Sequence, residues 1–288
     1  MAAMPAKLRA DQTFRRCLAM AAGVSVLALA AIVLFLLSQA LPIFSQVSLK
    51  DFLFSTEWYP TDDPPVFGIG ALIVGSLACA ALTTVIAVPT GVLTACAIHA
   101  GMPDGMKRVV KPMIELMAAL PSVVIGFIGM IILAPWLQNT FGLATGLNLT
   151  NASIMLAFMC VPTIASISED ALRNVPGGIR EASLALGATR WETLVKVELR
   201  WAMGGIATAV MLGISRVIGE TMVVLMVAGG AAIIPESIFD PVRPMTSSIA
   251  AEMAEAAVGD AHYHALYATG LVLQSLLHIS EPTTPIRR

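Results

Sequence analysis

The sequence EASLALGATRWETLVKVELR occupies residues 181–200 and carries six charged side chains. In the chain as a whole, only 12% of the 288 residues are charged and 57% are hydrophobic, with a mean hydropathy of +0.82. Soluble domains carry about 25% charged residues, so this composition is typical of a membrane protein with several spans. Because charged side chains are costly inside a bilayer, the stretch is expected to lie outside it.

The stretch and the residues just before it predict two short helices joined by a glycine turn. Pro176 suits a helix start, and residues 178–186 are good helix formers. Gly187 can end that helix, because glycine tolerates the left-handed conformation found at many helix C-termini. Thr189 and Glu192 have the spacing of a capping box, which would begin the second helix. We expect both helices to lie flat on the cytoplasmic side, with small and apolar side chains suited to a partner's groove.

Apolar segments predict an all-α membrane protein with about six transmembrane helices. These segments cover residues 17–41, 66–98, 112–137, 152–168, 201–234 and 264–277. The last is shorter than the roughly 20 residues that a spanning helix needs. We expect three parts: a cytoplasmic N-terminal segment (1–16), a transmembrane domain (17–277) containing the charged loop 169–200, and an atypical tail (278–288) with two prolines.

The distribution of Lys and Arg predicts the orientation in the membrane. With the N-terminus placed in the cytoplasm, fourteen of the seventeen lie in cytoplasmic segments, Lys50 and Arg243 lie on the other side, and Arg216 lies inside a span. Positive charge gathers on the cytoplasmic side of membrane proteins. The pattern therefore supports six alternating spans with both termini in the cytoplasm.

Two charged residues lie inside the predicted span 201–234. Arg216 and Glu220 are four residues apart, so they would share one helical face. A charge at the centre of a span costs about 2.5–3.5 kcal/mol on insertion scales, so each needs a partner or a watery cavity. The pair could neutralise itself. Alternatively, the face lines a translocation path, where Arg216 offers an oxyanion five donors and Glu220 holds the arginine in place.

The charged stretch resembles the cytoplasmic loop of ABC importer permeases, whose pattern is E-A-A, three residues, G, nine residues, I, one residue, L-P. Glu181, Ala182 and Ser183 match the first three positions, and Gly187 follows at the same spacing. Arg200 stands where proline is usual. The resemblance implies a coupling helix that docks into a cleft of the ATPase subunit, with Glu181, Ala182 and Gly187 in that contact.

Further stretches are similar to PstC-type permeases of phosphate importers. They are FGIGALIVGSL (67–77), GISRVIGETMVVLMVAGG (213–230), MTSSIAAEMAEA (245–256) and FSTEWYP (54–60). The resemblance implies a type I ABC importer permease fold in a bacterial inner membrane. It also implies a heterodimer with a paralogous permease, two ATP-binding subunits and a periplasmic phosphate-binding protein. ATP hydrolysis would then take place on the separate ATPase subunits.

The outside segment 247–257 predicts a short helix with Glu252 and Glu255 on one face. We expect this helix at the outer mouth, in contact with the binding protein or the partner permease; a solvated loop helix is the alternative. We expect membrane lipid as a further partner, and no nucleic acid, catalytic residue, metal or cofactor.

Other functions remain open from the residues alone. An ion-coupled secondary transporter would use buried carboxylates such as Glu115 and Glu220, and a purely structural membrane protein is a third interpretation. The chain has no G-x-x-x-x-G-K-[ST] phosphate loop, as expected for a subunit that leaves nucleotide binding to another chain. Within the permease interpretation, sulfate or molybdate could replace phosphate as the transported oxyanion.

Overall fold

The computed structural model describes residues 6–280, and its helices confirm the predicted all-α membrane protein. Within the described residues, five helical stretches are long and apolar enough to cross a membrane: Phe14–Ser45, Gly70–Gly101, Ser122–Phe141, Leu149–Arg173 and Arg190–Gly219. The sixth predicted segment lies in α13 (Ala261–Ser280), whose 20 residues span about 30 Å at 1.5 Å each. Of the predicted tail, residues 281–288 lie outside the described part of the chain.

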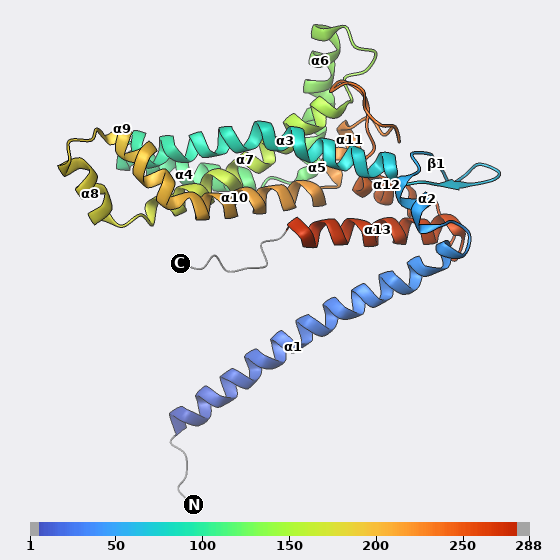
Figure 1. The fold of residues 1–288 in the computed structure, drawn as a ribbon, viewed down its shortest axis with the longest axis horizontal. Helices are drawn as coiled ribbons and strands as arrows, with labels where there is room; N and C mark the ends of the chain where they lie inside the picture. The colour runs from blue at the N-terminus through green and yellow to red at the C-terminus, as the bar shows by residue number, and fades with distance from the viewer. Residues whose placement is uncertain (1–5, 281–288) are drawn as a thin grey trace, which may run out of the picture.

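The centre of the bundle is formed by α3 (Gly70–Cys96), α7 (Leu149–Arg173) and α10 (Leu199–Gly219), which run side by side in Figure 1. A Cβ added at Gly91 of α3 would lie 2.8 Å from Ile164 of α7, and one added at Gly213 of α10 would lie 2.7 Å from Cys160 Sγ. Small residues let membrane helices approach closely where there is no water to drive them together. These two glycines therefore set the spacing of α7 from both neighbours.

The N-terminal helix α1 (Ala6–Ala40) diverges from this bundle (Figure 1). Its most apolar stretch has no residue buried within the chain. Near its C-terminal end it meets α13, where the rings of Phe35 and Tyr267 pack edge to face at 5.8 Å and His264 Nδ1 lies 2.6 Å from the Gln39 carbonyl. The turn η1 (Leu41–Ser45) follows directly. The apolar side chains in this stretch of α1 are thus not covered by the rest of the chain.

The segment after η1 folds into a small unit at one end of the bundle. It comprises α2 (Leu49–Phe54) and an antiparallel hairpin of β1 (Trp58–Tyr59) and β2 (Val66–Phe67). Buried side chains from these elements pack with α12 (Met245–Glu252) and α13, forming one apolar cluster. This cluster ties the outer loops to the last helix.

The predicted span 112–137 is wrong at its start. The residues are divided between α4 (Asp104–Ala118), α5 (Ser122–Ile128), the π-helical turn η3 (Gly129–Leu133) and α6 (Ala134–Phe141). Pro121 precedes α5, and a proline disfavours helix in the residue before it, so the chain breaks at residues 119–121. The spanning stretch begins at Ser122, and α4 is an amphipathic helix beside α7.

The predicted span 201–234 is also broken. Helix α10 ends at Gly219, Glu220 is extended, and the short helix α11 (Met222–Val227) follows. Gly229 and Gly230 then take positive φ values of 93° and 71° and turn the chain away. A continuous helix of that length would extend about 50 Å, well beyond the roughly 30 Å of a bilayer's apolar core.

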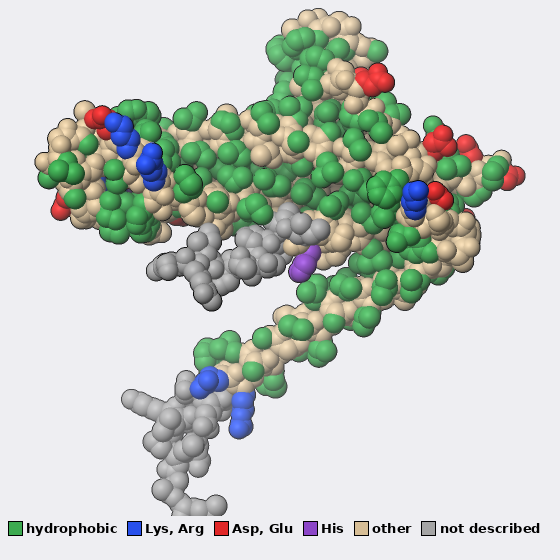
Figure 2. All heavy atoms as spheres, in the orientation of Figure 1, with side chains coloured by type: hydrophobic (Ala, Val, Ile, Leu, Met, Phe, Trp, Pro, Cys, Tyr) green, Lys and Arg blue, Asp and Glu red, His purple; other side chains and the backbone are tan. Residues whose placement is uncertain are grey.

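Charged side chains gather at the two ends of the molecule, and apolar ones cover the helices between them (Figure 2). One end holds α8 (Gly177–Ala185) and a cavity lined by five basic residues: Lys107, Arg108, Lys111, Arg173 and Arg180. The other end holds the hairpin and Arg243. The two internal loops that are rich in basic residues therefore lie at the same end of the bundle.

Candidate functional site

The predicted glycine turn is present. Helix α8 ends at Ala185, Gly187 has a φ of +87°, and Thr189 caps α9 (Arg190–Thr193). The capping box is reciprocal: Thr189 Oγ1 accepts from Glu192 N at 3.2 Å, and Glu192 Oε2 accepts from Thr189 N at 3.0 Å. These contacts fix the direction in which the chain leaves α8.

The second helix does not lie flat as predicted. Helix α9 continues without interruption through the π-helical turn η4 (Leu194–Glu198) into α10, and the stretch Arg190–Gly219 forms one long helix. No glycine or proline lies between Thr189 and Trp201, so nothing in the sequence ends the helix. Of the two predicted helices, α8 alone is separate, and the turn at Gly187 leads from it into a span (Figure 1).

Most residues of helix α8 are exposed. All of it belongs to the described part of the chain, and none of its residues is buried. Glu181, Ala182 and Gly187, the three predicted coupling residues, are exposed, and Leu186 is 90% exposed. We call α8 and the turn to Thr189 the coupling surface. An apolar residue held this far out of the bundle marks a surface suited to a partner.

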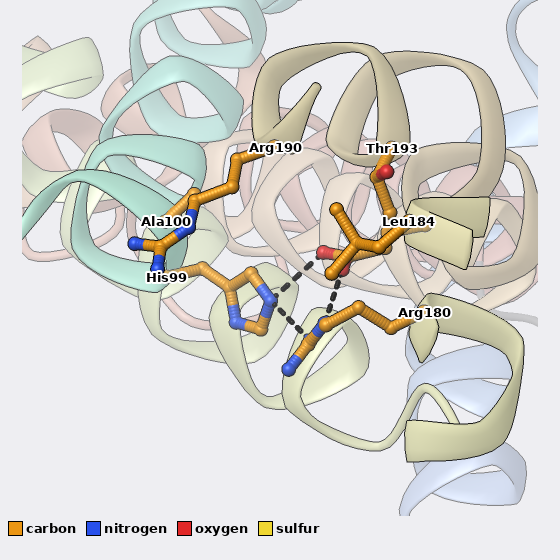
Figure 3. A pocket seen from close by; sticks show the side chains of 7 residues that line it. His99, Ala100, Arg180, Leu184, Arg190 and Thr193 are labelled. Carbon is orange, nitrogen blue, oxygen red and sulfur yellow. Dashed lines mark hydrogen bonds and ion pairs between the residues drawn. The ribbon is translucent and has the colours of Figure 1, made fainter. Parts of the chain in front are cut away.

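A cluster of three polar side chains that was not predicted from the sequence lies behind α8 (Figure 3). Arg180 Nε donates to Glu198 Oε1, and His99 Nε2 lies 3.0 Å from Glu198 Oε2. The three residues come from α8, from η4, and from η2 (Ala97–Gly101), a π-helical turn that ends α3. A partial indication of this cluster was present in the sequence, because the charged Glu198 lies between the apolar residues Val197 and Leu199 where a span begins.

Arg216 lies where two helix breaks meet. Its Nη2 donates to the carbonyl of Ala118 at the end of α4 (3.2 Å), and its Nη1 donates to Thr163 Oγ1 of α7 (3.4 Å). Irregular backbone at membrane depth occurs where it is buried in protein or lines a water-filled cavity. The arginine is exposed, so its guanidinium keeps donors available beyond these two bonds.

Glu220 does not share a helical face with Arg216. Both residues are described, and no hydrogen bond or ion pair joins them, because α10 ends between them. Glu220 Oε1 instead accepts from Met222 N at 3.1 Å and from Val223 N at 3.4 Å, which caps α11. The self-neutralising pair considered from the sequence is therefore wrong.

The outer carboxylates also separate. Helix α12 ends at Glu252, so Glu255 lies beyond it, and the expected shared helical face is wrong. Glu252 accepts from Arg243 Nη1 at 2.6 Å and from Trp58 Nε1 at 2.9 Å, and it lies 2.9 Å from His262 Nε2. This residue joins the hairpin, α12 and α13, while Glu255 remains exposed.

Lys111 ties α4 to α7. Its Nζ donates to Glu169 at 2.5 Å and to Asp170 at 2.6 Å. Burial alone would lower the pKa of Lys111, but the hydrogen bonds to Asp170 and Glu169 outweigh it and raise that pKa above its ordinary value. The amphipathic helix is thus held to the bundle by a charged lysine.

The family described as binding-protein-dependent transport system inner membrane component matches residues 87–254, more than half of the chain. The chain belongs to this family. The probable ABC transporter permease YqgH of Bacillus subtilis is 40% identical over 252 residues, covering 87% of this chain and 82% of that protein. The phosphate transport system permease PstC of Mesorhizobium japonicum is 35% identical over 241 residues, covering 77% and 73%.

Two solved transporters share the fold of this family member. A bacterial alginate ABC transporter aligns with a TM-score of 0.63 at 15% identity, covering 94% of this chain and 93% of that chain. The MetNI methionine ABC transporter, in an inward-facing conformation, aligns with a TM-score of 0.52 at 21% identity, covering 74% and 89%. The predicted type I ABC importer permease fold is therefore confirmed.

Membership of the family establishes the general role. The chain is a multi-pass inner-membrane subunit of an ABC importer, which works with an ATPase and a substrate-binding protein. This role sets aside the ion-coupled secondary transporter and the purely structural membrane protein.

Proposed function

We propose that this chain is the permease subunit through which an ATP-driven importer moves inorganic phosphate from the periplasm to the cytoplasm. The support is its similarity to permeases named for phosphate transport, three of which are 32–35% identical over 77–85% of this chain. The name of YqgH states no substrate, so sulfate and molybdate are the alternatives to test.

Arg216 is the residue proposed to meet the anion. Phosphate crossing a medium of low dielectric constant needs a cation, and the planar guanidinium suits oxyanions through paired hydrogen bonds. The bonds to Ala118 O and Thr163 Oγ1 hold the arginine at the helix breaks while it stays exposed. Glu220 contributes by fixing the start of α11 beside it.

The proposed complex contains a paralogous permease beside this chain, two ATP-binding subunits and a periplasmic phosphate-binding protein. The coupling surface, with Glu181, Ala182 and Gly187, faces the ATPase. Both termini lie in the cytoplasm, because the basic end of the bundle is the cytoplasmic end. This subunit has no catalytic role of its own and needs no cofactor. Glu255, exposed near Trp58, remains a proposed contact of the binding protein.

The test is uptake of labelled phosphate, sulfate and molybdate by cells in which this importer is the sole route for each anion in turn. We expect phosphate uptake that requires this chain, with little uptake of the other two anions. Sulfate or molybdate uptake without phosphate uptake would overturn the assignment of the substrate.

The variant Arg216→Gln tests the proposed role of Arg216 in the path. Arg200→Gln, on the same helix, is its control. Arg200 is exposed near the cytoplasmic end of α10, far along the helix from Arg216. We expect the loss of phosphate uptake only with Arg216→Gln, with both variants assembled in the complex. Equal uptake by the two variants would remove Arg216 from the proposed path.

A further inference from the structure

Glu198 is a buried carboxylate at the junction of three elements that are distant in sequence. Its side chain is 5% exposed, against 10% for His99 and 40% for Arg180. Arg180 belongs to α8, His99 to the end of α3, and Glu198 to the π-helical turn that leads into α10. In Figure 3 the side chains of His99 and Arg180 point toward one another, and Glu198 lines the same pocket.

The attachment of α8 to the bundle depends on polar contacts. Because α8, which is described in full, has no buried residue, apolar packing contributes little to holding it. Its side-chain bonds to the long helix are the Arg180–Glu198 ion pair and the contact of Ser183 Oγ with Thr193 Oγ1 at 2.9 Å. The ion pair is the charged one, and hydrogen bonds between charged partners are about twice as strong as neutral ones.

The bond between Arg180 and Glu198 does not depend on the protonation of His99. His99 Nε2 lies 3.0 Å from Glu198 Oε2 and 2.9 Å from Arg180 Nη2. An arginine only donates, so Nε2 must lack a proton to accept from it, and must carry one to donate to Glu198. The two histidine contacts therefore exclude each other, whereas the Arg180–Glu198 bond persists with either tautomer.

The position of Glu198 has a local cause. Residues 194–198 form a single π-helical turn, a feature that appears mostly as one-turn bulges and often at functional sites. The turn allows a carboxylate to face inward at the start of a span, close to His99, whose carbonyl oxygen also accepts from Lys107 Nζ at 2.6 Å. The cluster thus reaches α4 as well as α3.

We propose that Glu198 is a positioning residue which, through Arg180, makes α8 move as one body with α3 and α10. Displacement of α8 by the ATPase would then reach the spans that surround the path. Without the ion pair, α8 could shift about the Gly187 turn while the spans stay in place. This inference rests on the proposed function in that it takes the coupling surface to be the ATPase contact.

The test uses the whole complex in proteoliposomes and measures both ATP hydrolysis and uptake of labelled phosphate. We expect Glu198→Gln and Arg180→Gln to raise the ATP hydrolysed per phosphate imported by about fivefold or more, with all subunits still co-purifying. Arg180→Lys keeps the charge without the planar fork, so it should restore part of the coupling. A role in folding alone would lower hydrolysis and uptake together and leave their ratio unchanged.

Lys196→Gln is the matched control. Lys196 pairs with Glu192 at 3.0 Å within the same long helix, and both side chains are well exposed. This ion pair lies within one continuous helix and does not attach α8 to it. Its loss should therefore leave the ATP hydrolysed per phosphate imported unchanged. Because Arg180 is partly exposed, Arg180→Gln remains informative even if Glu198→Gln fails to fold.

A normal ratio in Arg180→Gln would overturn the inference, as would a ratio raised equally by Lys196→Gln. Failure of the proposed function is distinguishable from these outcomes, because the wild-type complex itself would then import no phosphate. If the wild type imports phosphate and the variants remain coupled, only the role of Glu198 is wrong.

Discussion

Arg216 lies in the last turn of α10, and Glu220, one residue past that helix, accepts hydrogen bonds from the first residues of α11. The two charges therefore act on opposite sides of a helix break. Arg216 is bonded to α4 and α7, while Glu220 shapes the chain that follows. Their different surroundings mean that neither residue can replace the other.

Arg216→Gln is expected to reduce phosphate uptake about tenfold or more, because a hydrogen bond to a charged group contributes about 1.5–3 kcal/mol. The exchange Arg216→Glu with Glu220→Arg should be equally inactive, because it places a carboxylate against the Ala118 carbonyl. Uptake of labelled phosphate in membranes with normal amounts of complex checks both. Near-normal uptake by the exchanged protein would contradict the proposed path.

Glu220→Ala should destabilise the protein by about 1 kcal/mol, because it removes the side chain that caps α11. Glu220→Gln keeps an oxygen acceptor at the same place, so its effect on stability should be smaller. Thermal unfolding of the purified complex measures the difference. Wild-type stability in Glu220→Ala would show that the cap contributes nothing.

Gly187→Ala should weaken the binding of the ATPase, because a left-handed conformation costs a residue with a Cβ about 1–2 kcal/mol. Gly187→Asn should be milder, since asparagine visits this conformation more readily. Co-purification of the ATPase subunit with the permease gives the measurement. Gly105→Ala is a control, because its φ is ordinary and no atom lies within 4 Å of an added Cβ.

Glu252→Ala should cost about 3 kcal/mol or more, because it leaves Arg243 without its carboxylate in a mostly buried site. It also frees Trp58 Nε1, so the fluorescence of the protein should change on substitution. Glu255→Ala is the matched control, three residues away and exposed. Similar melting temperatures for the two variants would show that the outer cluster is not held by Glu252.

The stabilisation from Lys111 should be constant between pH 6 and pH 9. A raised pKa means that this contribution is complete below the ordinary lysine value of about 10.4 and is lost only as pH rises through the higher folded value. The difference in melting temperature between the wild type and Lys111→Gln, followed over this range, checks it. A difference that declines between pH 7 and pH 9 would contradict the raised pKa.

Local features were predictable from the sequence, because residues a few positions apart determine them. The Gly187 turn and the Thr189–Glu192 capping box are of this kind. The break before Ser122 could also have been predicted, since Pro121 cannot continue a helix from the residue before it. The end of α10 was indicated only by length, because the apolar segment is too long for one span.

Contacts between distant residues could not be predicted in the same way. Trp58 and Glu252 are separated by 194 positions, and Arg180 meets His99 across 81. No periodicity or spacing relates such residues until the helices are packed. The contacts that Glu252 makes within the chain and the cluster around Glu198 were therefore not predicted, although both residues stand out in the sequence as charges beside apolar neighbours.

The three π-helical turns, η2, η3 and η4, each lie within a stretch long enough to span the membrane. A π-helical turn holds one residue more than the α-helical turn it replaces. Deleting one residue there would restore a regular helix without turning the flanking segments. The same deletion within α10 would rotate every later residue by about 100°. These turns are therefore places where a difference of one residue in chain length would leave the side chains of the flanking segments facing the same way.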